Sequence, residues 1–170
     1  IGVNWDITES KQILLALAAS EAKARMIIDA SPVPMALNDE AQGITYLNPV
    51  FIKTFGYSLE DIPSLADWWL KAYPDPDYRQ WVAQTWLEGL ERARRSEAAF
   101  APIEVKVHCK NGVVRTIMAG ATSLDSMFAG VHLVTLYDIT ALKQAQVAAE
   151  QAARIKAEFL AHLSHEIRTP

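Results

Sequence analysis

The segment Asn48-Pro49-Val50-Phe51-Ile52-Lys53-Thr54-Phe55-Gly56-Tyr57-Ser58 carries strong local folding signals. It predicts a short helix that opens at Asn48-Pro49, continues through Phe55 and ends at Gly56. Ser58 has the residue type of a helix N-cap, which predicts a second short helix from Leu59 to Ile62. Two short helices are therefore expected in the first half of the chain.

Strands are predicted on both sides of these helices. Apolar runs at 34–38 and 44–47 flank a turn-forming sequence, which predicts a β-hairpin. Further on, we expect helices at 67–73 and 77–96, the second capped by Asp77, and strands at 101–110, 113–124 and 128–137. Lys110-Asn111-Gly112 is a hairpin-turn signal between the first two of these strands. The order of two strands, several helices and three strands indicates an α+β fold with an antiparallel sheet.

The composition argues against several classes of protein. Hydrophobic residues make up 51% of the 170 residues, so a packed core is expected. The net charge of −4 argues against a nucleic-acid surface. A single cysteine, Cys109, rules out an internal disulfide, and the longest apolar run, Ile13 to Ala19, is too short to cross a bilayer. With no visible signal peptide, we expect a cytoplasmic chain without nucleic-acid or membrane contact, whose parent protein is either soluble or anchored elsewhere.

One short sequence occurs twice. Asp6-Ile7-Thr8-Glu9-Ser10-Lys11-Gln12 matches Asp138-Ile139-Thr140-Ala141-Leu142-Lys143-Gln144 at five of seven positions. Both copies are followed by a helical pattern, and their offset is about the length of a domain plus a linker. The repeat indicates that similar units precede the two helical segments.

Taken together, these motifs resemble those of a PAS sensor domain. The matches are Asn48-Pro49-Val50-Phe51, Phe55-Gly56-Tyr57-Ser58, the turn at 110–112 and the exit sequence Asp138-Ile139-Thr140. The resemblance implies a five-stranded antiparallel sheet with helices on one face, flanked by N- and C-terminal helices. It also implies three parts: 1–30 is a linker helix following an upstream PAS exit motif, 31–140 is the sensor domain, and 141–170 is a signalling helix that begins a phospho-acceptor helix.

The C-terminal stretch Phe159 to Pro170 resembles the phospho-acceptor box of sensor histidine kinases. It contains His165-Glu166-Ile167-Arg168-Thr169-Pro170. The resemblance implies that His165 accepts the γ-phosphoryl group of ATP, that Glu166 acts as the adjacent acid/base, and that Thr169 supports dephosphorylation of a response regulator.

The residue types suit that chemistry. A neutral imidazole is a nucleophile near neutral pH, and a neighbouring carboxylate can orient the ring and accept its proton. Phe159, Leu163 and Ile167 recur at helical spacing, and His165 lies off that stripe. A zinc site would need a further ligand beyond His162 and His165, so we expect no metal, and a zinc hydrolase built on these residues with Glu166 is a remote alternative.

The helical segments on either side of the domain predict a homodimer. Residues 10–29 show helical spacing of apolar residues, and residues 140–163 show a thin seam rich in alanine. Such helices pair when their apolar seams meet, although alanines bury little area. We therefore expect a marginal coiled coil through the flanking helices.

The signatures of PAS cofactors are missing. Flavin-binding relatives carry a cysteine on a short helix, whereas Cys109 is expected at the end of a strand. Haem-binding relatives use a histidine from the long helix, and residues 77–96 contain none. The five tryptophans are expected in the core or at interfaces. We predict no cofactor in this chain, with ATP and Mg²⁺ serving the full kinase and the PAS ligand unidentified.

The expected function is a sensor or signal-relay part of a two-component histidine kinase, hybrid or simple. The PAS domain would control phosphorylation of His165 and transfer of the phosphoryl group to an aspartate of a response-regulator receiver domain. Its own ATP-binding domain would be the other partner. The chain by itself is expected to be inactive, because no Gly-rich nucleotide-binding lobe follows the phospho-acceptor box in this sequence. The alternative is a PAS module that senses nothing and serves only as a dimerisation spacer.

Overall fold

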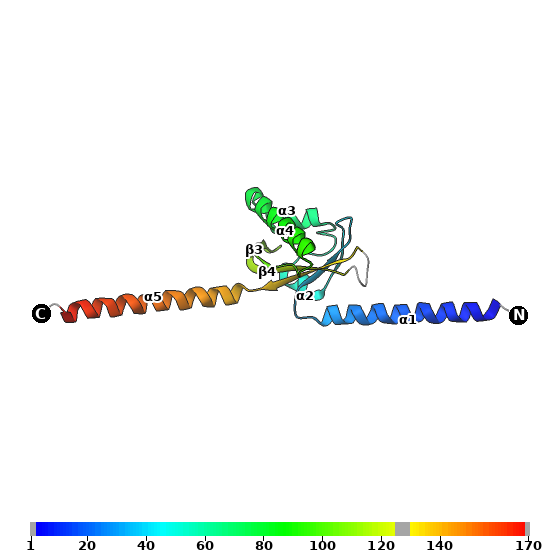
Figure 1. Ribbon diagram of the computed structural model, residues 1–170, viewed down its shortest axis with the longest axis horizontal. Coiled ribbons are helices and arrows are strands. Elements are labelled where there is room, and N and C mark those ends of the chain that lie inside the picture. The colour runs from blue at the N-terminus through cyan, green and yellow to red at the C-terminus, as the bar shows by residue number, and fades with distance from the viewer. Residues whose placement is uncertain (1–2, 125–129, 169–170) are drawn as a thin grey trace.

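The computed structural model describes residues 3–124 and 130–168, and in it five antiparallel strands form one sheet (Figure 1). The strands are β1 Met35–Asn38, β2 Ile44–Leu47, β3 Ile103–His108, β4 Val114–Ser123 and β5 His132–Asp138. Their order across the sheet is β2-β1-β5-β4-β3, so that the last strand in the chain lies at the centre. β5 pairs with β1 through Met35↔Thr135 and with β4 through Ala119↔Leu136.

Three helices pack on the sheet and two extend away from it. α2 Pro49–Phe55, α3 Leu65–Ala72 and α4 Pro76–Ser96 contribute buried residues to the same core as the strands. α1 Val3–Ala30 and α5 Thr140–Arg168 leave the domain in opposite directions, and the described ends of the chain lie far apart (Figure 1). In the described part of the chain, no helix combines the length and apolar character needed to span a membrane.

The core lies between the three helices and one face of the sheet. Val105 and Val107 on β3, Ile117 on β4 and Leu136 on β5 are at most 2% exposed, and their strand neighbours point to the other face. Alternate residues of a strand face opposite sides, so only one face of the sheet contributes to this core. The predicted α+β fold with a five-stranded sheet and helices on one face is confirmed.

The helix predicted at Asn48-Pro49 is α2, and its ends follow the sequence signals. The Asn48 side chain accepts a hydrogen bond from Phe51 N at 2.9 Å, and Pro49 stands in the first turn. Gly56 ends the helix with φ of +80°, and its N–H donates to Ile52 O. A Cβ at Gly56 would lie 3.1 Å from Lys110 Cβ, so both backbone angle and space favour glycine.

One predicted helix does not form, and the predicted start of the long helix was wrong. Residues 59–61 form a turn rather than a helix, because Asp61 N donates to Ser58 Oγ while Ser58 N donates to Asp61 Oδ2, which closes the segment after one turn. The long helix is capped by Asp75 instead of Asp77. Asp75 accepts from Tyr78 N at 2.7 Å, and Pro76 takes the first helical position, where proline loses no hydrogen bond.

Candidate functional site

His165 lies near the end of a long exposed helix. Every side chain of α5 from Gln144 to Arg168 is exposed, including Phe159 and Leu163. Successive helical residues rotate by about 100°, so His165 is turned by about 200° from both Leu163 and Ile167. The imidazole and the apolar stripe of α5 therefore lie on opposite sides of the helix.

The carboxylate of Glu166 faces a different histidine. Its Oε1 lies 3.5 Å from Nε2 of His162, one helical turn earlier, and both side chains are largely exposed. Residues at i and i+4 are neighbours on a helix surface, whereas i and i+1 are not. The predicted partner residue Thr169 lies outside the described residues.

A network of hydrogen bonds joins the sheet to the start of α5. Asp138 Oδ2 forms an ion pair with Arg115 Nη1 of β4 at 2.6 Å, and Asp138 Oδ1 accepts from the Thr140 backbone N at 2.9 Å and from its hydroxyl. Thr140 Oγ1 in turn accepts from Thr116 N at 2.9 Å. Partial burial opposes the charge on Asp138, but the bonds from Thr140 and Arg115 prevail and lower its pKa. The first turn of α5 is thus attached to the central strands.

α1 is attached to the domain through Asn48, the residues before β1, and Tyr46 of β2. Asn48 donates through Nδ2 to Ile28 O at 3.2 Å and to Val33 O at 2.9 Å, which ties the end of α1 to the core. Tyr46 of β2 donates to Asp29 Oδ1, and the Arg25 guanidinium lies 5.3 Å from the centre of the Tyr46 ring. Burial and the bond to Asp29 raise the pKa of Tyr46 to about 12. Both flanking helices therefore have specific polar anchors in the domain.

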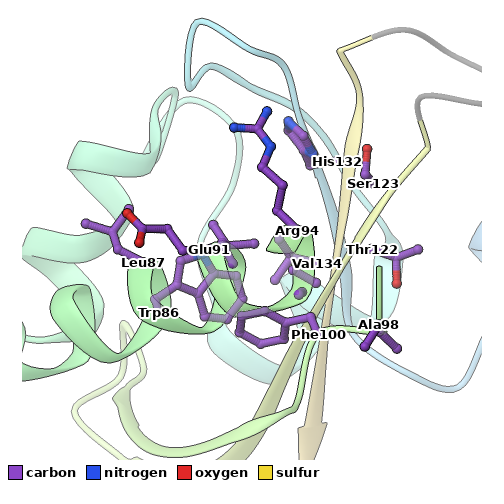
Figure 2. Close-up of a pocket in the computed structure, with 14 residues that line it drawn as sticks. Trp86, Leu87, Glu91, Arg94, Ala98, Phe100, Thr122, Ser123, His132 and Val134 are labelled. Atoms are coloured by element: carbon purple, nitrogen blue, oxygen red, sulfur yellow. The ribbon is translucent and has the colours of Figure 1, made fainter. Parts of the chain in front are cut away.

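A cavity of about 610 Å³ opens between the second half of α4 and the ends of β4 and β5 (Figure 2). Its walls are mostly apolar and include Trp86, Phe100 and Val134, with small alanines around them. Arg94, Glu91, Thr122, Ser123 and His132 supply polar groups. The centre of the domain, in contrast, is filled by aromatic side chains, since the rings of Phe51 and Phe55 pack within 6 Å of Trp68.

Cys109 is not placed where flavin chemistry would need a cysteine. It follows β3, is 4% exposed, and its thiol lies 3.6 Å from Thr54 O. Burial raises the pKa of its thiol, which disfavours the reactive thiolate. This position does not suit a cysteine that would react with a bound flavin, and the absence of a flavin stays a prediction. The predicted absence of haem rests on the lack of histidine in α4.

Within residues 3–124 and 130–168, no group of three or more His, Cys, Asp or Glu side chains is arranged to hold a metal ion. Of the tryptophans, Trp68 is buried in the core, Trp86 lines the cavity and Trp81 is half exposed. Trp68, Trp69 and Trp86 thus belong to the core or pack against it, as expected, whereas Trp81 does not, and the side chain of Trp5 lies outside the described residues.

Comparisons with known proteins support the interpretation of residues in the first part of the chain as a PAS domain. A family model described as a PAS domain matches residues 22–93. The sensor histidine kinase TmoS of Ectopseudomonas mendocina is 31% identical over 173 residues, covering 94% of this chain and 17% of TmoS. The peroxide stress-activated histidine kinase mak1 of Schizosaccharomyces pombe is 27% identical over 168 residues, covering 91% of this chain and 10% of mak1.

The fold is also shared with a solved structure, an RNA-binding Light-Oxygen-Voltage receptor. The TM-score is 0.56 at 16% identity, and the match covers 81% of this chain and 38% of that one. At this identity the likeness speaks for the fold alone. The chain thus contains a PAS domain with homologues among sensor histidine kinases, and it spans less than a fifth of the length of the two kinases described above.

Sequence reasoning missed two features of the site. The ion pair of Arg115 with Asp138 joins residues 23 positions apart, and only the antiparallel register of β4 and β5 brings them together. The cavity was expected only in general terms, because its walls come from α4, the segment after it, β4 and β5. The sequence offered one signal for the ion pair: Arg115 stands in a predicted strand, three residues after the Lys110-Asn111-Gly112 turn.

Proposed function

We propose that this chain is the sensor and relay part of a two-component histidine kinase, in which the PAS domain controls phosphorylation of His165. The observation that carries the proposal is the continuity of α5. One helix runs from Thr140, which is hydrogen-bonded to the sheet, to the region of His165. A change in the sheet at Thr116 or Asp138 can therefore turn or shift the helix that presents the imidazole.

The proposed reaction is attack of a neutral imidazole nitrogen of His165 on the γ-phosphorus of ATP. An N–P bond forms, the bond from the γ-phosphorus to the β,γ-bridging oxygen breaks, and ADP leaves. The proton on the second ring nitrogen passes to Glu166. For this step the exposed Glu166 side chain leaves His162 and turns toward His165. Mg²⁺ held with ATP in a separate ATP-binding domain would neutralise the phosphate charge.

In the second step, the phosphoryl group moves to a receiver domain of a response regulator. An aspartate oxygen attacks phosphorus, the N–P bond breaks, and an acyl phosphate forms. We assign Glu166 and Thr169 to support of the reverse, hydrolytic reaction on the regulator. The exposed face of α5 that carries His165 leaves room for both partners in turn.

We propose further that the chain acts as a homodimer through its flanking helices. The apolar stripe of α5 includes Leu142, Phe159, Leu160, Leu163 and Ile167, and side chains at these positions are between 37% and 83% exposed. A second copy of the same stripe would cover it in a parallel pair. In this scheme residues 1–30 receive a signal, residues 31–140 sense or relay it, and residues 141–170 transmit it in the cytoplasm, where ATP is available.

Phosphorylation mapping tests the proposal. In a chimera, this chain replaces the aligned segment of TmoS, and the rest of TmoS supplies an ATP-binding domain. After incubation with ATP and Mg²⁺, mass spectrometry of samples kept at alkaline pH detects phosphohistidine. The proposal predicts phosphate on His165, none in His165→Gln, and normal labelling in the matched control His162→Gln. Labelling that survives in His165→Gln would contradict it.

A non-sensing spacer is the second candidate, favoured by the filled centre of the domain. Phe51, Phe55 and Trp68 occupy the space between the helices and the sheet. In that case the PAS domain would only set the distance between neighbouring domains, and no small molecule would alter phosphorylation of the chimera.

A further inference from the structure

The cavity beside α4 exists because the chain turns sharply at the end of that helix. Glu97 ends α4 in the left-handed region with φ of +48°, and Ala98 N donates back to Ala93 O at 3.1 Å. The next residues return along the helix, so Phe100 packs against Trp86 with ring centres 4.7 Å apart. Small residues at Ala93, Ala99 and Ala121 leave the space beside this aromatic pair open.

The aromatic wall is held firmly in place. Phe100 is 9% exposed, and a Cβ added to Gly89 would lie 2.8 Å from Cε2 of its ring. The ring therefore lies directly over the glycine of α4 and cannot move toward the helix. A flat apolar body that enters the cavity meets a fixed surface, which lowers the entropic cost of binding.

The polar groups of the cavity favour an anion. Figure 2 shows the Arg94 guanidinium and the His132 ring extending toward the same end of the cavity, with the Ser123 hydroxyl on the neighbouring strand. Among the described residues, neither Arg94 nor His132 has a hydrogen bond or ion pair through its side chain. These donors are therefore available to a ligand.

Glu91 also lines the cavity, but its charge is already compensated. Its Oε2 lies 3.0 Å from Nη2 of Arg95, one turn further along α4. The remaining charge at the cavity is the positive charge of Arg94. One guanidinium suits one carboxylate, since the two groups have matching planar geometry.

We propose that this cavity binds a small carboxylate with a flat aromatic or alicyclic body, with the rings against Trp86 and Phe100 and the carboxylate at Arg94 and His132. Its volume lies within the range of small-molecule sites. This inference rests on the proposed sensing function and names the chemical class of the signal. β4 and β5, which form one wall, also carry Thr116 and Asp138 at the start of α5, so an occupied cavity and the relay helix share two strands.

Two probes with the same rings separate charge from shape. Calorimetric titration of the purified chain with 2-naphthoate and with neutral 2-naphthylmethanol gives both affinities, and ¹H–¹⁵N spectra locate the site at Ala121, Thr122 and the Trp86 indole. We expect 2-naphthoate to bind about tenfold more tightly, which is the usual effect of one charge-assisted hydrogen bond. Arg94→Gln should remove this preference and leave binding of the alcohol unchanged.

Matched variants complete the test. Arg92→Gln removes the same charge from α4 at a position that does not line the cavity, and it should keep the preference for naphthoate. Ala121→Phe should weaken both probes by filling the space. Equal affinities for the two probes, equal losses in the Arg92 and Arg94 variants, or no binding of either probe would each overturn the proposal.

The two experiments distinguish failure of the ligand proposal from failure of the proposed kinase function. His165 phosphorylation in the chimera without any naphthoate binding would overturn the ligand class and leave the relay intact. Naphthoate binding with the expected variant pattern, in a chimera that never labels His165, would support the ligand class and contradict the kinase role.

Discussion

Asn48 shows how one side chain can organise three parts of a domain. It is completely buried, and its amide uses all of its hydrogen-bonding capacity. Oδ1 accepts from Met35 N and Phe51 N, while Nδ2 donates to Ile28 O and Val33 O. The end of α1, the start of β1 and the first turn of α2 therefore depend on the same residue.

Replacement of Asn48 by alanine should be strongly destabilising. The change removes a helix cap and leaves four backbone groups without this partner, so we expect a loss of about 2–4 kcal/mol in the free energy of unfolding. Urea unfolding of the wild type and the variant measures this difference in free energy. Asn38→Ala is the control. Asn38 is also buried, but to the described residues its side chain makes one hydrogen bond, of 3.3 Å to Asp39 O, so its replacement should lower the free energy of unfolding much less.

Asp61 should make the stability of the domain depend on pH in the acidic range. Hydrogen bonds from Lys110 Nζ at 2.7 Å and from the Ser58 backbone hold the pKa of Asp61 at about 2, below its ordinary 3.8. A lowered pKa in the folded state stabilises the fold above about pH 4 and loses that contribution as pH falls toward 2.

The variant Asp61→Asn isolates this effect. The difference in urea midpoint between wild type and variant should be constant from pH 7 to 5 and should shrink between pH 4 and 2. Lys110→Met, which removes the partner, should shift the same decline to higher pH. A difference that does not change across this interval would contradict the assignment.

Among the elements, the β5–α5 junction is the connection on which the proposed signal relay depends. Thr140→Val keeps the shape of the side chain but removes the acceptor of Thr116 N and the donor to Asp138 Oδ1. We expect the free energy of unfolding to fall by roughly 1–2 kcal/mol and the backbone amide of Thr116 to exchange its hydrogen faster. Thr45→Val is the control, since its exposed hydroxyl makes one long bond of 3.3 Å to Leu37 O.

Elements with signals in their own backbone chemistry could be predicted from the sequence. Asn48-Pro49 and Gly56 mark the ends of α2, and Gly112, with φ of +83°, forms the predicted turn between β3 and β4. The helix expected at Leu59 to Ile62 failed because four residues are too few to sustain a helix against the reciprocal bonds of Ser58 and Asp61.

Features that depend on the register of the sheet could not be predicted in the same way. Arg115 meets Asp138 only because β4 and β5 pair in one antiparallel register, and the cavity joins α4 to strand ends far along the chain. His165 and Glu166 were identified by resemblance, and their roles remain predictions. The pairing of Glu166 with His162 was not expected from the motif.

At the scale of the whole molecule, the exposed apolar stripe of α5 predicts self-association. Phe159→Glu places a charge in the stripe, where Phe159 is 62% exposed in the single chain, and should convert a dimer to monomer in sedimentation velocity. Val147→Glu is the matched control, because Val147 lies on the opposite side of the same helix and is 51% exposed. Equal effects of the two variants would argue against a dimer through this stripe.

We propose that α5 carries the state of the PAS domain to His165 as one rigid helix. Insertions after Gln146 in the TmoS chimera test this proposal, with the rate of His165 phosphorylation as the measurement. Seven added residues keep the face of the helix nearly unchanged, whereas two rotate His165 by about 200° relative to the sheet. We expect the seven-residue insertion to preserve the wild-type rate of phosphorylation and the two-residue insertion to change it severalfold. The same rate in all three proteins would contradict it.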